Sequence, residues 1–187
     1  ISRLLGRGDR ETADRAASTA LYSSIFVGAA VILCAVIFLK PLLKCLGATD
    51  SILPYAVTYA GIYVVSSIFN VFNVTMNNIV TSEGAARTTM CVLLTGAALN
   101  MVLDPVFIYV LKLGVAGAAI ATAISQAVST LVYLYYVISG RSMFCFRFRN
   151  CCFSNEIMSE ILKIGIPTLA FQLLTSLSIT MINMQAK

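Results

Sequence analysis

Four stretches of this chain carry no charged residue for longer than a lipid bilayer is thick, and a fifth carries a single charge, Asp104. A hydrocarbon core of about 30 Å needs roughly 20 predominantly apolar residues of α-helix to cross it. The stretches therefore predict an all-α fold, a polytopic transmembrane helix bundle with about five spans. They cover residues 16–39, 51–82, 88–111, 113–140 and 164–186.

Composition agrees with a membrane location. Apolar residues make up 59% of the chain and charged residues 11%, whereas soluble domains carry about 25% charge. The net charge of +5 does not indicate nucleic acid binding, because the basic residues lie in short loops between the predicted spans. The chain starts at Ile1 within a polar loop and stops at Lys187 directly after the fifth span, so we expect it to be an internal piece of a longer protein.

The distribution of basic residues predicts the orientation of the bundle. All eight arginines fall in alternate loops, and with Lys163 they give nine basic residues on one side of the membrane against four lysines on the other. Cytoplasmic loops carry the excess of lysine and arginine in membrane proteins. The arginine side is therefore predicted to be cytoplasmic, so that the first span runs outward and residues 40–50 form an outer loop.

The longest polar segment divides the chain. We interpret residues 140–163 as a cytoplasmic linker with an amphipathic helix between two helical lobes. Residues 1–139 are then four helices of the first lobe, and residues 164–187 are the first helix of the second. Phe144 and Phe146 alternate with cysteine and arginine in the linker, a pattern that we assign to aromatic and basic side chains at the level of the lipid headgroups.

Two sets of small or polar residues are aligned on helix faces. Asn70, Asn73 and Asn77 share one face of the second span by their spacing. They fit either hydrogen bonds between helices or the wall of a polar cavity. In the fourth span small residues recur at every fourth position, which lets another helix approach closely. This stripe consists of Gly117, Ala121, Ser125 and Ser129.

Asp104 is the residue with the clearest functional implication. An ionised carboxylate within the membrane costs roughly 2.5–3.5 kcal/mol on insertion scales, so it needs a partner or a water-filled cavity. Asn100 precedes it by four residues and shares its helix face. Pro105 has no N–H to donate, which frees the carbonyl of Met101 one turn back. An acid, an amide and a carbonyl on one face are oxygen ligands suited to a small hard cation or a proton.

Thr122 in the fourth span is a further candidate. Asp104 is expected about 9 Å below the outer end of the third span, and Thr122 about 10 Å below the outer end of the fourth. Because the turn between these helices is short, we expect antiparallel neighbours in which Asn100, Asp104 and Thr122 meet. The alternative is that Asp104 only hydrogen-bonds Thr122 or Gln126 to hold the helices together.

Several of these segments resemble the multidrug and toxic compound extrusion (MATE) family of cation-coupled antiporters. The most specific pattern is L-N-x-x-x-D-P followed by G-V-x-G-A-A-I-A-T. The resemblance implies twelve helices in two six-helix lobes, of which this chain would cover the third to sixth helices, the linker and the first helix of the second lobe. The resembling stretches are LLGRGDRETADRA (4–16), LGATDSILPYA (46–56), FNVFNVTMNNIVTSEGAAR (69–87), LNMVLDPVFIY (99–109), GVAGAAIATAISQ (114–126) and IGIPTLAFQLLTSLS (164–178).

The resemblance also implies a proton or Na⁺ site in the first lobe. Asn100, Asp104 and Thr122 match residues of that site. Asn77 matches by position, although it is expected nearer the cytoplasm. Asp104 and Asn100 would ligate the metal ion if it were Na⁺. A further aspartate of the family site belongs to the first helix, outside this chain.

The function implied by the resemblance is that of a cation-coupled antiporter, driven by H⁺ or Na⁺, that exports organic, cationic drugs or metabolites by alternating access. Such a protein needs no cofactor and is not an enzyme. Its partners would be a small-molecule substrate, an organic cation, together with the lipid bilayer and the remainder of the transporter chain. Its location would be the plasma membrane, as a multi-pass protein of the bacterial inner membrane.

Three other classes make different demands on the sequence. A lipid-linked saccharide flippase of related architecture would have a basic cavity, and no arginine lies in any predicted span. A membrane-embedded enzyme would need a catalytic pair, but Asp104 is the one acid inside a span and the chain has no histidine. A non-transport structural subunit would not need Asp104. No P-loop pattern appears that would suggest ATP as the driver.

Overall fold

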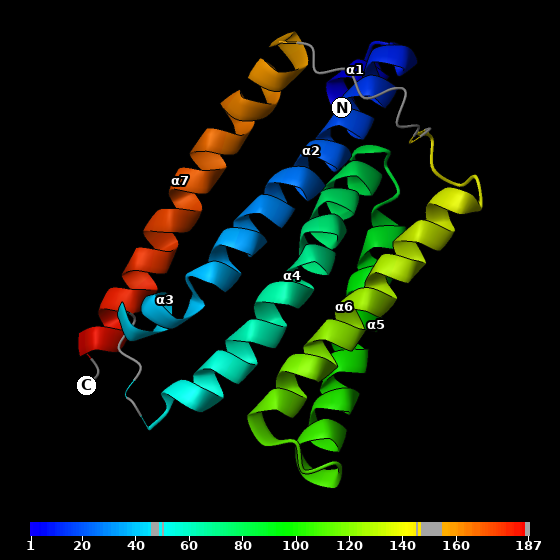
Figure 1. Ribbon diagram of the computed structural model, residues 1–187. Helices are drawn as coiled ribbons and strands as arrows, with labels where there is room; N and C mark the ends of the chain where they lie inside the picture. Colours follow the sequence, from blue (N-terminus) through cyan, green and yellow to red (C-terminus); the bar gives the residue numbers. More distant parts are fainter. Residues whose placement is uncertain (46–48, 50, 145, 147–154, 186–187) are drawn as a thin grey trace.

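The computed structural model describes residues 1–45, 49, 51–144, 146 and 155–185, and these form helices joined by short connections. Within those ranges there is no β-strand, so the predicted all-α class is confirmed. A π-helical turn, η1, continues α5 directly. The elements are α1 (Ser2–Gly6), α2 (Arg10–Ile37), α3 (Leu39–Cys45), α4 (Leu53–Ser82), α5 (Ala86–Pro105), η1 (Val106–Val110), α6 (Gly114–Ile138) and α7 (Asn155–Gln185), as Figure 1 shows.

The five predicted spans are all present as helices. α2, α4, α5 with η1, α6 and residues 161–179 of α7 are each long and apolar enough to cross a membrane. Pro54 lies in the first turn of α4, where a missing N–H interrupts no helical hydrogen bond. The expectation of a loop directly after the first span was wrong, because α3 forms there. Pro41 falls in its first turn and is tolerated for the same reason.

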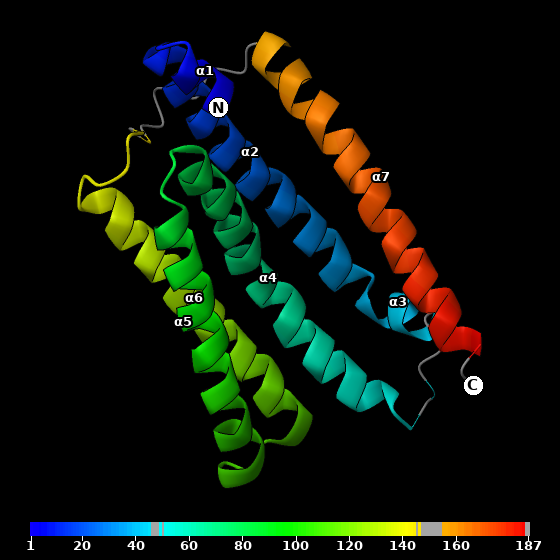
Figure 2. The ribbon, with the colours of Figure 1, turned by 180° about the vertical axis from the view of Figure 1, so that it is seen from behind.

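α4 is the central helix of the bundle. It packs against α2 on one side and α6 on the other, and α5 packs against α6. Both views show the order α7, α2, α4, α6 across the molecule (Figure 1, Figure 2). The described side chains of α7 from Leu162 to Ile182 are exposed. α7 also runs as one helix across the predicted boundary between residues 163 and 164, so no break marks it, and the division into two lobes stays a prediction.

The buried apolar core is concentrated at one end of the bundle. α2 contributes to it near its N-terminus, α4 near its C-terminus and α6 near its C-terminus. Met76 on α4 is fully buried, and Tyr133 on α6 is 1% exposed. This is the end at which α1 and the α4–α5 turn lie (Figure 1). The core consists of Ala13, Ala17, Leu21, Met76, Ile79, Val80, Val92, Tyr133, Tyr136 and Phe144.

Phe144 shows where the headgroup prediction was wrong. Its side chain is only 4% exposed and belongs to the core. Its ring meets the Phe146 ring edge to face, with centroids 6.4 Å apart. Glu83, just after α4, accepts hydrogen bonds from Ser142 Oγ at 2.6 Å and from the Tyr136 hydroxyl at 3.2 Å. These contacts hold the start of the predicted linker against the bundle.

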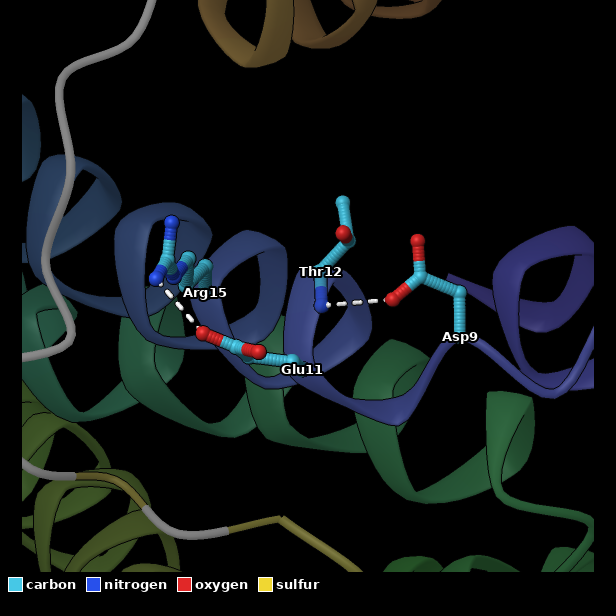
Figure 3. Close-up of polar contacts among 4 residues, drawn as sticks. All are labelled: Asp9, Glu11, Thr12 and Arg15. Atoms are coloured by element: carbon cyan, nitrogen blue, oxygen red, sulfur yellow. Dashed lines mark hydrogen bonds and ion pairs between the residues drawn. The ribbon is translucent and has the colours of Figure 1, made fainter.

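Asp9 caps the N-terminus of α2. Its Oδ1 accepts a hydrogen bond from the Thr12 amide at 3.1 Å, and Glu11 in the same turn pairs with Arg15 at 2.6 Å (Figure 3). Hydrogen bonding from Thr12, through its side chain and its backbone amide, lowers the pKa of the Asp9 carboxyl from the ordinary value of 3.8. An acidic cap and an acidic first turn both complement the partial positive charge of a helix N-terminus.

Candidate functional site

A cavity of about 430 Å³ lies between α4, α5 and α6. Its polar lining consists of amides and hydroxyls, and none of its lining residues carries a charge. Asp104 is not among them, but its carboxylate adjoins the cavity through Asn100. The lining residues are Asn70, Asn73, Val74, Asn77, Asn78, Val92, Leu93, Gly96, Ala97, Asn100, Thr122, Ser125, Gln126, Ser129 and Tyr133.

Three of the four predicted site residues meet at one end of this cavity, and we call them the acid cluster: Asn100, Asp104 and Thr122. Asn100 Nδ2 lies 3.3 Å from Asp104 Oδ1 and 3.4 Å from Thr122 Oγ1. Thr122 Oγ1 in turn donates to the carbonyl of Ala118 at 3.0 Å. The prediction that α5 and α6 are antiparallel neighbours whose Asn100, Asp104 and Thr122 side chains meet is therefore confirmed.

The carboxylate of Asp104 retains free acceptor capacity. Asn100 is its only hydrogen-bond donor in the described part of the chain, whereas an ionised carboxylate offers about four lone-pair sites. Asp104 is half-buried on α5, within a span. If the side-chain amide of Asn100 flips, its oxygen takes the place of its nitrogen. The cluster then offers carboxylate, amide and hydroxyl oxygens to one small cation.

The backbone after Asp104 departs from regular α-helix. Pro105 ends α5, and the Leu111 N–H donates to the Val106 carbonyl at 3.0 Å, a spacing of five residues. Proline was expected to interrupt hydrogen bonding here. The insertion of a π-helical turn was not predicted. Such turns are rare and occur frequently at functional sites.

A second group of residues joins α4 to α6 along the cavity, further from Asp104, and we call it the amide cluster: Asn73, Asn77, Gln126 through its main-chain carbonyl, Thr130 and Tyr133. Asn73 Nδ2 donates to the Gln126 carbonyl at 2.9 Å, and Thr130 Oγ1 donates to Asn73 Oδ1 at 3.0 Å. Asn77 Nδ2 donates to the Tyr133 hydroxyl at 3.2 Å.

Asn77 is the predicted site residue that the structure keeps apart from the other three. It lines the same cavity, but its hydrogen bond goes to Tyr133 rather than to the acid cluster. The two interpretations of Asn70, Asn73 and Asn77 both hold, since all three line the cavity and two of them bond α6.

Ser125 and Gln126 were not predicted to be site residues. Ser125 Oγ and Gln126 Oε1 are buried without a hydrogen-bond partner, although buried polar atoms nearly always have one. Both residues line the cavity, where a bound molecule or water would satisfy them. The available signal was spacing, because Gln126 follows Thr122 by four residues and shares its helix face. Gln126 does not bond Asp104, which was one of the alternatives.

The small-residue stripe of α6 serves helix packing, as predicted. All four of its members are buried. A Cβ built on Gly117 would lie 2.7 Å from the carbonyl oxygen of Phe107, and one built on Gly96 of α5 would lie 2.5 Å from Ser129 Oγ. Within the described ranges no three His, Cys, Asp or Glu residues gather as a metal cluster.

Comparisons with known proteins cover nearly the whole chain. The MatE family profile matches residues 1–106. The multidrug export protein MepA of Staphylococcus aureus (strain bovine RF122 / ET3-1) is 30% identical over 184 residues, which are 98% of this chain and 41% of that protein. The protein of the same name from Staphylococcus haemolyticus (strain JCSC1435) is 29% identical over the same share. The chain thus spans about two fifths of the length of these relatives.

Solved structures agree in fold. A multidrug resistance MATE family transporter of the MOP superfamily in its outward-facing conformation has a TM-score of 0.89 and 33% identity, over 96% of this chain and 40% of that one. An inward-facing conformation has a TM-score of 0.84 and 34% identity, over 89% of this chain and 38% of that one. The relatives are named for export rather than for catalysis, in line with the expectation that the chain is not an enzyme.

Proposed function

The chain belongs to the MatE family, and from this premise we propose that it forms part of a transporter that exports small organic molecules in exchange for H⁺ or Na⁺. The chain is a multi-pass membrane protein, and its relatives in staphylococci are multidrug export proteins. On this proposal it lies in the plasma membrane of a bacterium with its arginine-rich loops in the cytoplasm.

The observation that carries the coupling role is the acid cluster. Asp104 is the one acidic side chain of the described spans that lies away from the first two turns of its helix, and holding it ionised there costs roughly 2.5–3.5 kcal/mol. A neutral residue would join α5 to α6 at lower cost. The cost is explained if Asp104 alternately binds and releases a proton or Na⁺, with Asn100 and Thr122 completing the oxygen ligands.

Coupling follows if the ion binds one arrangement of the transporter more tightly than the other. A ligand shifts a conformational equilibrium only by its difference in affinity for the two states. The described helices match both an inward-facing and an outward-facing transporter structure, with TM-scores of 0.84 and 0.89. This supports a first lobe that keeps its internal shape while the two lobes rock against each other.

The lining of the cavity favours an organic cation as the substrate. Its polar groups are amides, hydroxyls and the Tyr133 ring, and none of its lining residues is basic. Aromatic faces and carbonyl oxygens attract a positive charge. The phosphate of a lipid-linked saccharide would need basic partners, which this part of the cavity lacks.

Replacing Asp104 with Asn in the full-length transporter tests the proposal. Asp104→Asn keeps the size of the side chain but removes the charge, so ion-dependent efflux of a cationic dye from cells or proteoliposomes should be abolished. Membrane levels of the protein should stay unchanged. Glu11→Gln is the matched control, since it makes the same chemical change at an exposed ion pair. Unchanged ion-dependent efflux in Asp104→Asn would remove the coupling role.

A further inference from the structure

Gly117 of α6 lies against the backbone of η1, one helical turn from the acid cluster. A Cβ built on Gly117 of α6 would be 2.7 Å from Phe107 O, 2.8 Å from Phe107 C and 3.2 Å from Ile108 N. All three atoms are backbone atoms of η1, so no flexible side chain can move aside. A Cβ there would force the two elements about 0.7 Å apart to reach the 3.4 Å of an ordinary contact.

This contact and the acid cluster involve the same two elements. Phe107 follows Asp104 by three residues, and Gly117 precedes Thr122 by five, which is about one turn along each antiparallel helix. The hydrogen bonds of the cluster are long, with Asn100 Nδ2 at 3.3 Å from Asp104 and 3.4 Å from Thr122. A separation of a few tenths of an ångström would therefore break the connection between α5 and α6.

The π-helical turn brings the Phe107 carbonyl to this position. Phe107 O accepts a hydrogen bond from the Leu113 N–H at 3.1 Å, six residues on, while Val106 O accepts from the Leu111 N–H. The turn thus directs a carbonyl across to α6, where only a glycine leaves room for it. Pro105 favours this geometry because it cannot donate the hydrogen bond that a regular α-helix would require.

We propose that Gly117 is a positioning residue for the acid cluster. Its contact with the η1 backbone sets the one separation of α5 and α6 at which Asn100 bridges Asp104 and Thr122. The contact thereby sets the ion affinity of Asp104. This inference rests on the proposed function, because it needs Asp104 to bind the coupling ion.

Few other groups near Asp104 titrate or carry charge. Lys112 lies in the turn between η1 and α6, and Tyr109 on η1 is 76% exposed. The cavity-lining residues contributed by α4 and α6 are uncharged. Within the described part of the chain, Asp104 is therefore the acid to which a change in the ion dependence of transport is assigned.

The test is a set of glycine-to-alanine variants of the full-length transporter in proteoliposomes, with ethidium as the transported dye. The Na⁺ concentration, and separately the pH, at half-maximal efflux are measured for each. We expect Gly117→Ala to raise the half-saturating Na⁺ concentration about tenfold, because Thr122 Oγ1 moves away from the ligands of the ion. The half-saturating H⁺ concentration should fall, because Asn100 is then held less firmly as a donor to the carboxylate. The maximal rate at saturating ion should change much less.

Two glycines in spans supply matched controls. Gly61→Ala adds a Cβ that meets only Leu39 Cδ2, at 3.8 Å, and should leave efflux unchanged. Gly96→Ala disturbs the same α5–α6 pair, but against the movable Ser129 hydroxyl. It also adds a methyl group to the cavity wall, so it should lower thermal stability and change the dye concentration at half-maximal efflux, but leave the half-saturating ion concentration unchanged. If Gly96→Ala shifted the half-saturating ion concentration as much as Gly117→Ala, the proposal would be overturned. Any loosening of the contact between α5 and α6 would then be enough to weaken ion binding.

Pro105→Ala provides an independent variant without a steric clash. It restores an N–H at the start of the π-helical turn and should shift the ion dependence in the same direction as Gly117→Ala, by a smaller factor. If Gly117→Ala does not reach the membrane, the result for Pro105→Ala tests the proposal in its place. A shifted half-saturating ion concentration in Pro105→Ala supports the proposal, and an unchanged one overturns it. Coupling retained in Asp104→Asn would remove the proposed function itself, whereas coupling lost there with no shift in Gly117→Ala would remove only the positioning role.

Discussion

The two ends of the cavity are built from similar side chains but differ in how tightly these are held. In the amide cluster, neutral groups on α4 and α6 form hydrogen bonds of 2.9–3.2 Å. In the acid cluster, a carboxylate on α5 is approached at 3.3 Å, and the connection to α6 measures 3.4 Å. One end is suited to holding helices together, and the other is suited to exchanging a ligand. In a single polar cavity, the residues that stabilise helix packing can therefore be different from the residues that bind the coupling ion.

The same substitution made in the acid cluster and in the amide cluster tests whether the two differ in their effect on ion binding. Asn100→Ala removes the only donor to Asp104 in the described part of the chain. If the Asn100 amide oxygen ligates Na⁺, its loss should raise the half-saturating Na⁺ concentration about 10- to 100-fold, the factor that corresponds to about 1.5–3 kcal/mol. The half-saturating H⁺ concentration should fall instead, because the carboxylate loses a donor that stabilises its charged form. Asn77→Ala, at the amide cluster, should change either concentration less than about threefold. Equal shifts in ion-dependent dye efflux for the two variants would show that the ends do not differ.

A substitution in the amide cluster should lower the stability of the protein and leave the ion dependence of efflux unchanged. Asn73→Ala loses the bond to the Gln126 main-chain carbonyl and the bond from Thr130, while the Thr130 hydroxyl keeps its bond to that carbonyl. Each lost hydrogen bond costs about 0.5–1.5 kcal/mol. Thermal unfolding of the purified full-length protein in detergent should therefore shift downward, with the ion dependence of efflux retained. A variant as stable as the parent would contradict a structural role for the amide cluster.

The smallest effect is expected for an acid outside the cavity. Asp9 caps α2, and hydrogen bonding from Thr12 lowers its pKa below 3.8, so the cap's contribution to stability is fully present above that pH. It is lost as the pH falls through the lower, folded-state value. Asp9→Asn, which keeps a capping oxygen, should leave efflux at neutral pH unchanged and weaken the acid sensitivity of helix content seen by circular dichroism below about pH 4. An altered ion dependence would mean that coupling also depends on an acid outside the cavity.

The sequence predicted those features that depend on local pattern. Charge-free runs gave the five spans, because crossing a bilayer requires length and apolarity alone. The spacing of Asn100 and Asp104 put them on one face, and the short turn after η1 brought Thr122 beside them. The position of Asn77 in the cavity was predicted, but its bond to Tyr133 was not.

Features that depend on packing were missed. The π-helical turn forms where the interruption at Pro105 coincides with Gly117 on the neighbouring helix, and the sequence pattern of neither helix alone shows this contact. The burial of Phe144 depends on a space between α2, α4 and α6 that no alternation pattern reveals. Gln126 could be placed on the face of Thr122, but its unpaired oxygen becomes visible only once the neighbours of α6 are known.

The concentration of the core at one end has a mechanical consequence for α4. The helix has 30 residues and is therefore about 45 Å long, and its buried apolar anchors, Met76, Ile79 and Val80, lie near its C-terminus. A tilt of about 5° around those anchors moves the opposite tip by about 3 Å, close to the roughly 2.8 Å diameter of a water molecule. A small change of angle can thus move the N-terminal end of α4 by the width of a water molecule while every anchored contact stays in place.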